Sequence, residues 1–151
     1  MTSPFPFSSG AVLTSAQLNN IGSWVDFTPA SGNWSSRVTV NLARYAQVNK
    51  LVVVKYKITL NATPTSGDGN FSVAQPVAEE SGDSPTGTIG GGYLHDANTS
   101  YSYPVLAFIS GTEFFLRYIP TGASDVTVDY NSPFTFVSGD EIRFLAIYEA
   151  D

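Results

Sequence analysis

The stretch from Arg37 to Leu60, RVTVNLARYAQVNKLVVVKYKITL, decides the fold. In its second arm every second residue from Val52 to Leu60 is apolar, while Lys55 and Lys57 occupy positions between them. This period of two is the pattern of a strand with one buried face. Asn49 stands at the corner between the arms, where the chain needs a residue that accepts a positive φ. The sequence therefore predicts a β-hairpin and an all-β protein.

The composition limits the classes of function. The 151 residues suit one domain that buries a core without covalent links. Cysteine is absent, so no disulfide or thiolate site is available and the redox compartment stays open. Seven basic residues stand against thirteen acidic ones, and a net charge of −6 gives no footprint for nucleic acid. We therefore expect no nucleic-acid binding.

The surface is expected to be neutral and polar, and the chain is not expected to enter a membrane. Only 13% of the residues are charged, against roughly one quarter in typical globular domains. This balance is found in β-rich extracellular and virion proteins. No basic residue precedes Arg37, and no apolar run approaches the length that spans a bilayer, so neither a signal peptide nor membrane insertion is expected.

The first 22 residues differ from the rest of the chain. Met1–Gly10 contains two prolines and two phenylalanines without a period, which indicates an extended arm. Thr14 and Gln17 fit a capping box, and Gly22 can end the helix, so one short helix is predicted over Ser15–Ile21. The expected organisation is an attachment segment over residues 1–22 and a β-sandwich domain over residues 23–151.

The remainder alternates strand patterns with turn signals about every 8 to 12 residues, as in an antiparallel sandwich or barrel. The last pattern is apolar on both sides, because Leu145 and Ile147 stand between the residues of its other apolar face. Both sides are expected to be covered, either by the second sheet and a loop or by a neighbouring subunit. Besides the hairpin, strands are expected at Trp24–Thr28, Phe71–Pro76, Ile89–His95, Tyr101–Ile109, Glu113–Tyr118, Val126–Tyr130 and Ile142–Tyr148.

Two loops are candidates for contact with a partner, Ala78–Gly92 and Asp96–Ser100. The first is long for a compact β domain and carries Glu79, Glu80 and Asp83. A solvated acidic loop is the alternative.

No catalytic motif stands out, and no enzymatic activity is expected. His95 is the only histidine, and no serine stands in a nucleophile elbow, so a surface or packing role is expected for His95. Carboxylate pairs such as Glu79 with Asp83, or Asp125 with Asp129, could hydrolyse a glycoside only at a separation in space that a sequence does not give.

Two glycine-containing segments resemble ligand loops without completing the motif. Ser66–Asn70 alternates oxygen ligands with glycine, but the distal glutamate of a calcium loop is missing, so a plain turn is expected. Gly90–Gly92 does not lie between a predicted strand and a predicted helix, as a phosphate-binding glycine loop does. We therefore expect a flexible or closely packed backbone segment here. No cofactor and no metal site are expected.

Several aromatic residues lie outside the clear alternation. In one interpretation these residues are exposed and stack on sugar rings or anchor protein interfaces. In the other they plug the ends of the sandwich or pack between subunits. These residues are Trp34, Tyr93, Tyr101, Tyr103, Tyr118 and Tyr130.

Three blocks together resemble a known family. The first runs SGAVLTSAQLNNIGSW over Ser9–Trp24 with FTP after it, the second lies in the hairpin over Ala43–Val54, and the third runs from PFTFVSGD at Pro133 to Ala150. They cover about a third of the chain and are similar to small β domains of tailed-bacteriophage minor tail, fibre and head decoration proteins. In long fibre proteins such a junction follows a large attachment region, whereas here it begins near Met1.

The resemblance implies a trimeric, jelly-roll-like β-sandwich on the surface of the virion. We therefore expect a homotrimer that contacts other virion proteins, either the major capsid protein or tail components. The position of the junction favours a capsid decoration or tail-associated structural role, anchored by the arm and helix. The expected anchoring residues are Phe5, Phe7, Leu13, Leu18 and Ile21.

Two other functions stay open. A tail fibre or tip protein would recognise a host surface glycan through its loops, with Tyr93, His95, Tyr101 and Tyr103 as candidate ligand-binding residues. A polysaccharide hydrolase is the third hypothesis, and substitution of the carboxylates of the acidic loop would test it.

Overall fold

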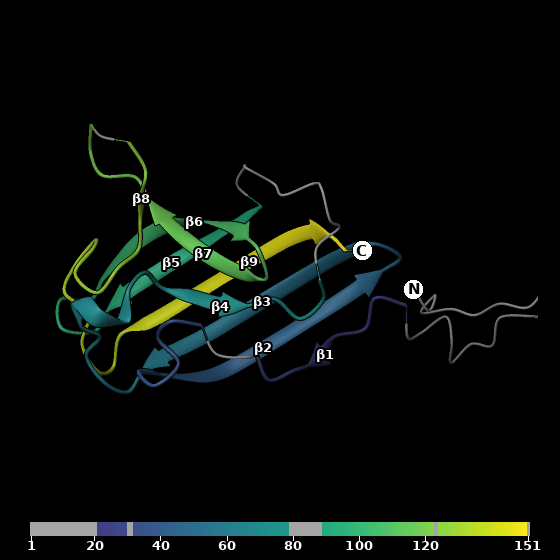
Figure 1. The fold of residues 1–151 in the computed structure, drawn as a ribbon, viewed down its shortest axis with the longest axis horizontal. Coiled ribbons are helices and arrows are strands. Elements are labelled where there is room, and N and C mark those ends of the chain that lie inside the picture. Colours follow the sequence, from purple (N-terminus) through teal and green to yellow (C-terminus); the bar gives the residue numbers. More distant parts are fainter. Residues whose placement is uncertain (1–20, 30–31, 79–88, 123, 151) are drawn as a thin grey trace, which may run out of the picture.

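A computed structural model describes residues 21–29, 32–78, 89–122 and 124–150. This part of the chain is almost entirely β-structure, with one short 3₁₀ helix (Figure 1). The elements are β1 (Val25–Asp26), β2 (Val38–Val48), β3 (Leu51–Leu60), η1 (Ser66–Asp68), β4 (Ser72–Ala74), β5 (Gly90–Asp96), β6 (Tyr101–Ser110), β7 (Glu113–Tyr118), β8 (Val126–Thr127) and β9 (Glu141–Glu149).

The strands form one antiparallel sheet in the order β1-β2-β3-β9-β5-β6-β7-β4, with β8 paired to β7. The last strand, β9, therefore lies between β3 and β5 and joins the N-terminal hairpin to the β5-β6-β7 meander. All pairings are antiparallel, which confirms the predicted fold class of an all-β antiparallel sandwich.

The sheet folds over on itself, so that β4 and β7 lie across from β3 and β9 (Figure 1). The ring of Phe114 in β7 lies 5.9 Å from Tyr56 in β3, although these strands are not neighbours in the sheet. The Tyr56 hydroxyl also donates to the carbonyl of Ala74 in β4, at 2.5 Å. These contacts cross the core and hold the two layers together.

The β2–β3 hairpin has the predicted corner. Val48 pairs with Leu51, and Asn49 takes a φ of 55°. The side chain of Gln47 donates to the carbonyl of Asn49 at 2.9 Å, which holds the corner from one side. A register shift between Val40 and Leu42 marks a bulge in β2.

The corner gives a direct test. Replacing Asn49 with alanine should cost about 1 kcal/mol, since an alanine at positive φ carries a strain that asparagine tolerates better. Replacing it with glycine should be close to neutral. Urea unfolding measures both effects, with Asn131→Ala as the control, because the φ of Asn131 is not positive. Equal losses for the two Asn49 variants would contradict the interpretation.

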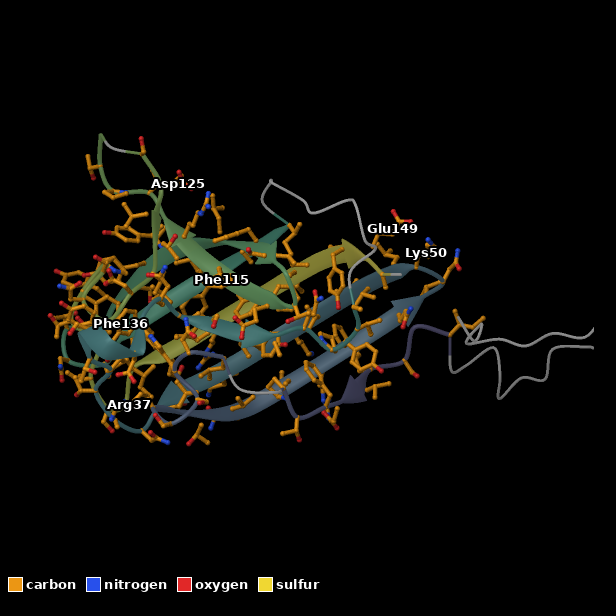
Figure 2. The ribbon with its side chains drawn as sticks, viewed as in Figure 1. Arg37, Lys50, Phe115, Asp125, Phe136 and Glu149 are labelled. Atoms are coloured by element: carbon orange, nitrogen blue, oxygen red, sulfur yellow. The ribbon has the colours of Figure 1, made fainter. Side chains whose placement is uncertain are left out.

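Aromatic rings close one end of the sandwich. Trp34, fully buried, lies 5.5 Å from Phe71 and 5.1 Å from Phe136, and its indole donates to the carbonyl of Gly69. Figure 2 places Phe136 at the end of the molecule opposite Lys50 and Glu149. Trp34 thus plugs the sandwich, one of the two interpretations offered for it.

The two faces of β9 differ sharply. Ile142, Phe144, Ala146 and Tyr148 face the core and are buried, whereas Leu145 and Ile147 on the outer face are 41% and 45% exposed. The described residues therefore cover one face of this strand, and among them neither a second sheet nor a loop covers the outer face.

Other predictions differ in extent or lie outside the described residues. The first strand and the strand at Val126 are only two residues long, shorter than predicted. The arm Met1–Gly10 and the anchoring residues Phe5, Phe7, Leu13 and Leu18 lie outside the described residues, as does all of the predicted helix except Ile21.

Candidate functional site

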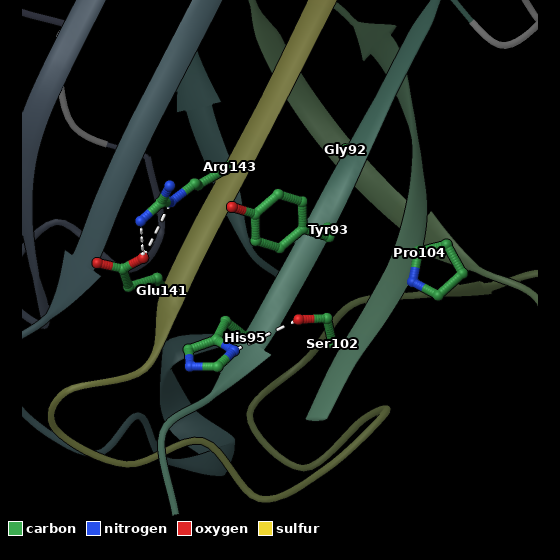
Figure 3. A pocket seen from close by; sticks show the side chains of 7 residues that line it. All are labelled: Gly92, Tyr93, His95, Ser102, Pro104, Glu141 and Arg143. Carbon is green, nitrogen blue, oxygen red and sulfur yellow. Dashed lines mark hydrogen bonds and ion pairs between the residues drawn. The ribbon is translucent and has the colours of Figure 1, made fainter. Parts of the chain in front are cut away.

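A shallow pocket of about 440 Å³ opens on the outer face of the sheet, over β9, β5 and β6 (Figure 3). It lies on regular strands, not at a loop, so its side chains are fixed by the sheet register. The pocket is lined by Gly92, Tyr93, His95, Ser102, Pro104, Glu141 and Arg143.

Strand alternation and register explain this set. Leu94 points into the core and is fully buried, so Tyr93 and His95 on either side of it point outward. Tyr93 pairs with Arg143 on one side and with Pro104 on the other. His95 likewise stands between Glu141 and Ser102. The pocket therefore consists of two adjacent cross-strand rows.

An ion-pair cluster forms the β9 side of the pocket. The Glu141 carboxylate accepts hydrogen bonds from the guanidinium of Arg143 and lies 3.2 Å from Lys57 Nζ in β3. Burial alone would raise the pKa of Glu141, but hydrogen bonds from Arg143 and Lys57 outweigh it and hold that pKa below its usual value. The hydrogen bond to Glu141 in turn raises the pKa of Arg143. Glu141 and Arg143 are therefore held in their ionised forms as a pair.

Tyr93 gives the pocket an aromatic surface. Its ring lies 5.7 Å from the guanidinium carbon of Arg143, and the residue is 37% exposed. Figure 3 shows its hydroxyl directed toward Arg143. Pro104 adds an apolar surface on the β6 side.

At the other end of the pocket, His95 Nδ1 lies 3.3 Å from the Ser102 hydroxyl. The next residue, Asp96, does not complete a triad with this pair, because its carboxylate accepts from the Thr99 hydroxyl and from the backbone N–H of Asn98 and Thr99. The Thr99 hydrogen bond, with these backbone bonds, lowers the pKa of Asp96. Asp96 therefore shapes the Asp96–Ser100 turn.

The four candidate ligand-binding residues do not form one cluster. Tyr93 and His95 line the pocket. Tyr103 points to the opposite face, where it stacks on Phe134 with ring centroids 5.0 Å apart. Tyr101, 68% exposed, is not among the lining residues.

Sequence reasoning missed the pocket residues Ser102, Pro104, Glu141 and Arg143. Glu141 and Arg143 alternate with buried Ile142 and Phe144, so the pattern of β9 could have placed them on its outer face. Nothing in the sequence indicated that β9 pairs with β5, which brings them to Tyr93 and His95.

The segments that resembled ligand loops have structural roles. In η1, the Asp68 carboxylate accepts from Thr65 and forms an ion pair with Arg37. These hydrogen bonds, the Thr65 backbone bond first, lower the pKa of Asp68. Gly90–Gly92 is the start of β5 and packs closely on β9, the second of the two predicted alternatives.

The remaining candidate residues from the sequence do not form a site among the described residues. Ile21 is 39% exposed, and Glu79, Glu80 and Asp83 lie outside the described residues. Among the residues that the structure describes, no group of three histidine or carboxylate side chains could hold a metal ion. In the same part of the chain no helix has the length and apolar character needed to cross a membrane.

No protein-family model, curated protein or solved structure matches this chain. The assignment of a function therefore depends on the geometry of the structure and on the sequence.

Proposed function

We propose that this protein is a non-enzymatic structural component of a bacteriophage particle, displayed on its surface as a homotrimer. The observation that carries the proposal is an exposed apolar strip on the outer face of the sheet, formed by Val48, Leu51, Leu145 and Ile147. The resemblance of the sequence to small virion β domains supplies the setting.

The apolar strip is continuous. Val48 and Leu51 face each other across the hairpin, and the next outward residue of β3, Val53, pairs with Ile147. The four side chains of the strip are between 41% and 52% exposed. Contiguous exposed apolar surface is typical of interaction sites.

Most charged side chains on the same face are paired within the chain. Across the whole chain the net charge is −6, so two copies repel each other on average. On the outer face, however, Arg44 is paired with Asp26, and Lys57 and Arg143 are paired with Glu141. Lys55, opposite Leu145 in the register, lies over the Trp24 ring and adds a positive charge beside the strip, so burial of the apolar area must outweigh the repulsion between copies that meet through this face.

Substitutions in the apolar strip test the proposed homotrimer. Sedimentation equilibrium should give a trimer, and a Leu145→Ser/Ile147→Ser double variant should weaken association at least tenfold, because each side chain contributes about 1.5–3 kcal/mol when fully buried. Val126→Ser is the control, since Val126 is also an exposed β-branched apolar residue but lies in β8, away from the strip. A monomeric wild-type protein would refute the proposed assembly.

The role on the particle requires a separate measurement. Gold-labelled antibody on purified particles should label the head if the protein is a decoration or cement protein bound to the major capsid protein. Label confined to the tail would make it a tail-associated component. Particles without label would refute the virion role, whatever the oligomeric state.

A further inference from the structure

We infer that the pocket on β9, β5 and β6 is a binding site for a saccharide that carries a carboxylate. The inference goes beyond the structural role, because it concerns a different part of the outer face. The pocket is lined by Glu141 and Arg143 of β9, whereas the apolar strip begins at the next outward residue, Leu145, and continues to Ile147.

The size and shape of the pocket suit one sugar unit. A volume of about 440 Å³ lies within the usual range for small-ligand sites, and the lining combines an aromatic ring with convergent polar groups. The half-exposed ring of Tyr93 offers a flat apolar surface for the C–H face of a pyranose ring. Pro104 extends this surface across to β6.

The polar groups are held in place and still have hydrogen-bonding capacity. Arg143 uses its Nε and one Nη on Glu141, which leaves the other Nη. His95 engages Ser102 through Nδ1, which leaves Nε2. The pocket thus offers a guanidinium donor and a ring nitrogen to a ligand, and sugar hydroxyl groups, which both donate and accept, can pair with either.

The local charge favours an acidic sugar. Two cations, Lys57 and Arg143, share the single carboxylate of Glu141, which leaves one positive charge beside the pocket in a chain of net charge −6. A carboxylate on the ligand would neutralise this remaining positive charge and can pair with the guanidinium of Arg143. A small inorganic anion would use the charge but not Tyr93 or Pro104.

Two sugars that differ only in the carboxylate test the inference. Methyl α-D-glucuronoside and methyl α-D-glucoside are titrated into the ¹⁵N-labelled full chain while amide shifts are followed by NMR. The glucuronoside should bind with a dissociation constant of about 1 mM and shift the amides of Tyr93, His95 and Arg143. The glucoside should bind about twofold to fivefold more weakly, because it lacks one partly exposed ion pair.

Three variants separate the contributions. Tyr93→Ala should weaken glucuronoside binding about tenfold, whereas Tyr101→Ala, at an exposed tyrosine outside the pocket, should leave it unchanged. Arg143→Gln should abolish the preference for the acidic sugar, since Glu141 then neutralises Lys57 alone. Arg143 is a surface residue, so this variant keeps the test valid even if Tyr93→Ala does not fold.

The opposite results would overturn the inference. It is wrong if neither glycoside shifts the pocket amides, if both bind equally well, or if Tyr93→Ala and Tyr101→Ala bind alike. None of these results would bear on the trimer or on its place in the particle.

Discussion

Replacing Phe114 with alanine is expected to lower the free energy of unfolding by about 3–5 kcal/mol. The side chain is fully buried in β7, and its ring lies 5.9 Å from Tyr56, 5.8 Å from Phe144 and 5.7 Å from Tyr148. These partners belong to β3 and β9, which face β7 across the core. Truncation would therefore open a cavity between the layers, and a domain of this size has only about 5–15 kcal/mol of stability.

The neighbouring residue is the matched control. Phe115 lies on the outer face, where it stacks on Phe108 with ring centroids 5.6 Å apart. Phe115→Ala removes the same ring from the same strand but leaves no cavity in the core, so a loss of about 1 kcal/mol is expected. Urea unfolding followed by circular dichroism compares the two variants. Equal losses would mean that Phe114 does not connect the layers as described.

Local patterns in the sequence were sufficient to predict most strands. Alternation in Glu113–Tyr118 gave β7 with its observed bounds, and the hairpin between Arg37 and Leu60 appears as β2 and β3. Such patterns act over a few residues, because a strand that buries one face must alternate whatever its neighbours are. The positive φ of Asn49 followed from the same local reasoning.

The order of the strands could not be predicted in this way. Nothing in the residues of β9 indicates that it lies between β3 and β5, because backbone pairing carries little sequence signal over such separations. The pocket depends on that order, since it is the pairing of β9 with β5 that brings Arg143 to Tyr93. The sequence therefore yielded Tyr93 and His95 but not their partners.

Tyr103 illustrates a second limit. It was grouped with Tyr93, His95 and Tyr101 because the four are close in the sequence. In the structure β5 and β6 pair with Leu94 opposite Tyr103, so Tyr103 shares the inner face with Leu94 and packs on Phe134. Proximity along the chain does not tell which face of a strand a residue occupies until the register is known.

Replacing Gly92 with alanine is expected to be comparably destabilising, with a loss of about 3 kcal/mol. A Cβ at this position would lie 1.9 Å from the carbonyl oxygen of Arg143 and 2.5 Å from the Cα of Phe144. Both atoms belong to the backbone of β9, so no side-chain rotation relieves the contact and the strands must separate. Because Tyr93 is the next residue, the separation would also displace its ring from Arg143 and open the pocket.

Other glycines provide a graded control for this prediction. At Gly91 the nearest atom to an added Cβ is the Val105 carbonyl oxygen at 3.0 Å, so a loss of about 1 kcal/mol is expected. At Gly67 the nearest atom is 3.9 Å away, so alanine should have little effect. Urea unfolding should rank the losses Gly92, Gly91, Gly67, and hydrogen exchange should accelerate at the β5–β9 amides in Gly92→Ala alone. If Gly92→Ala were as stable as Gly67→Ala, β5 would not pack on β9 this closely, and the distances within the pocket would no longer support a sugar site.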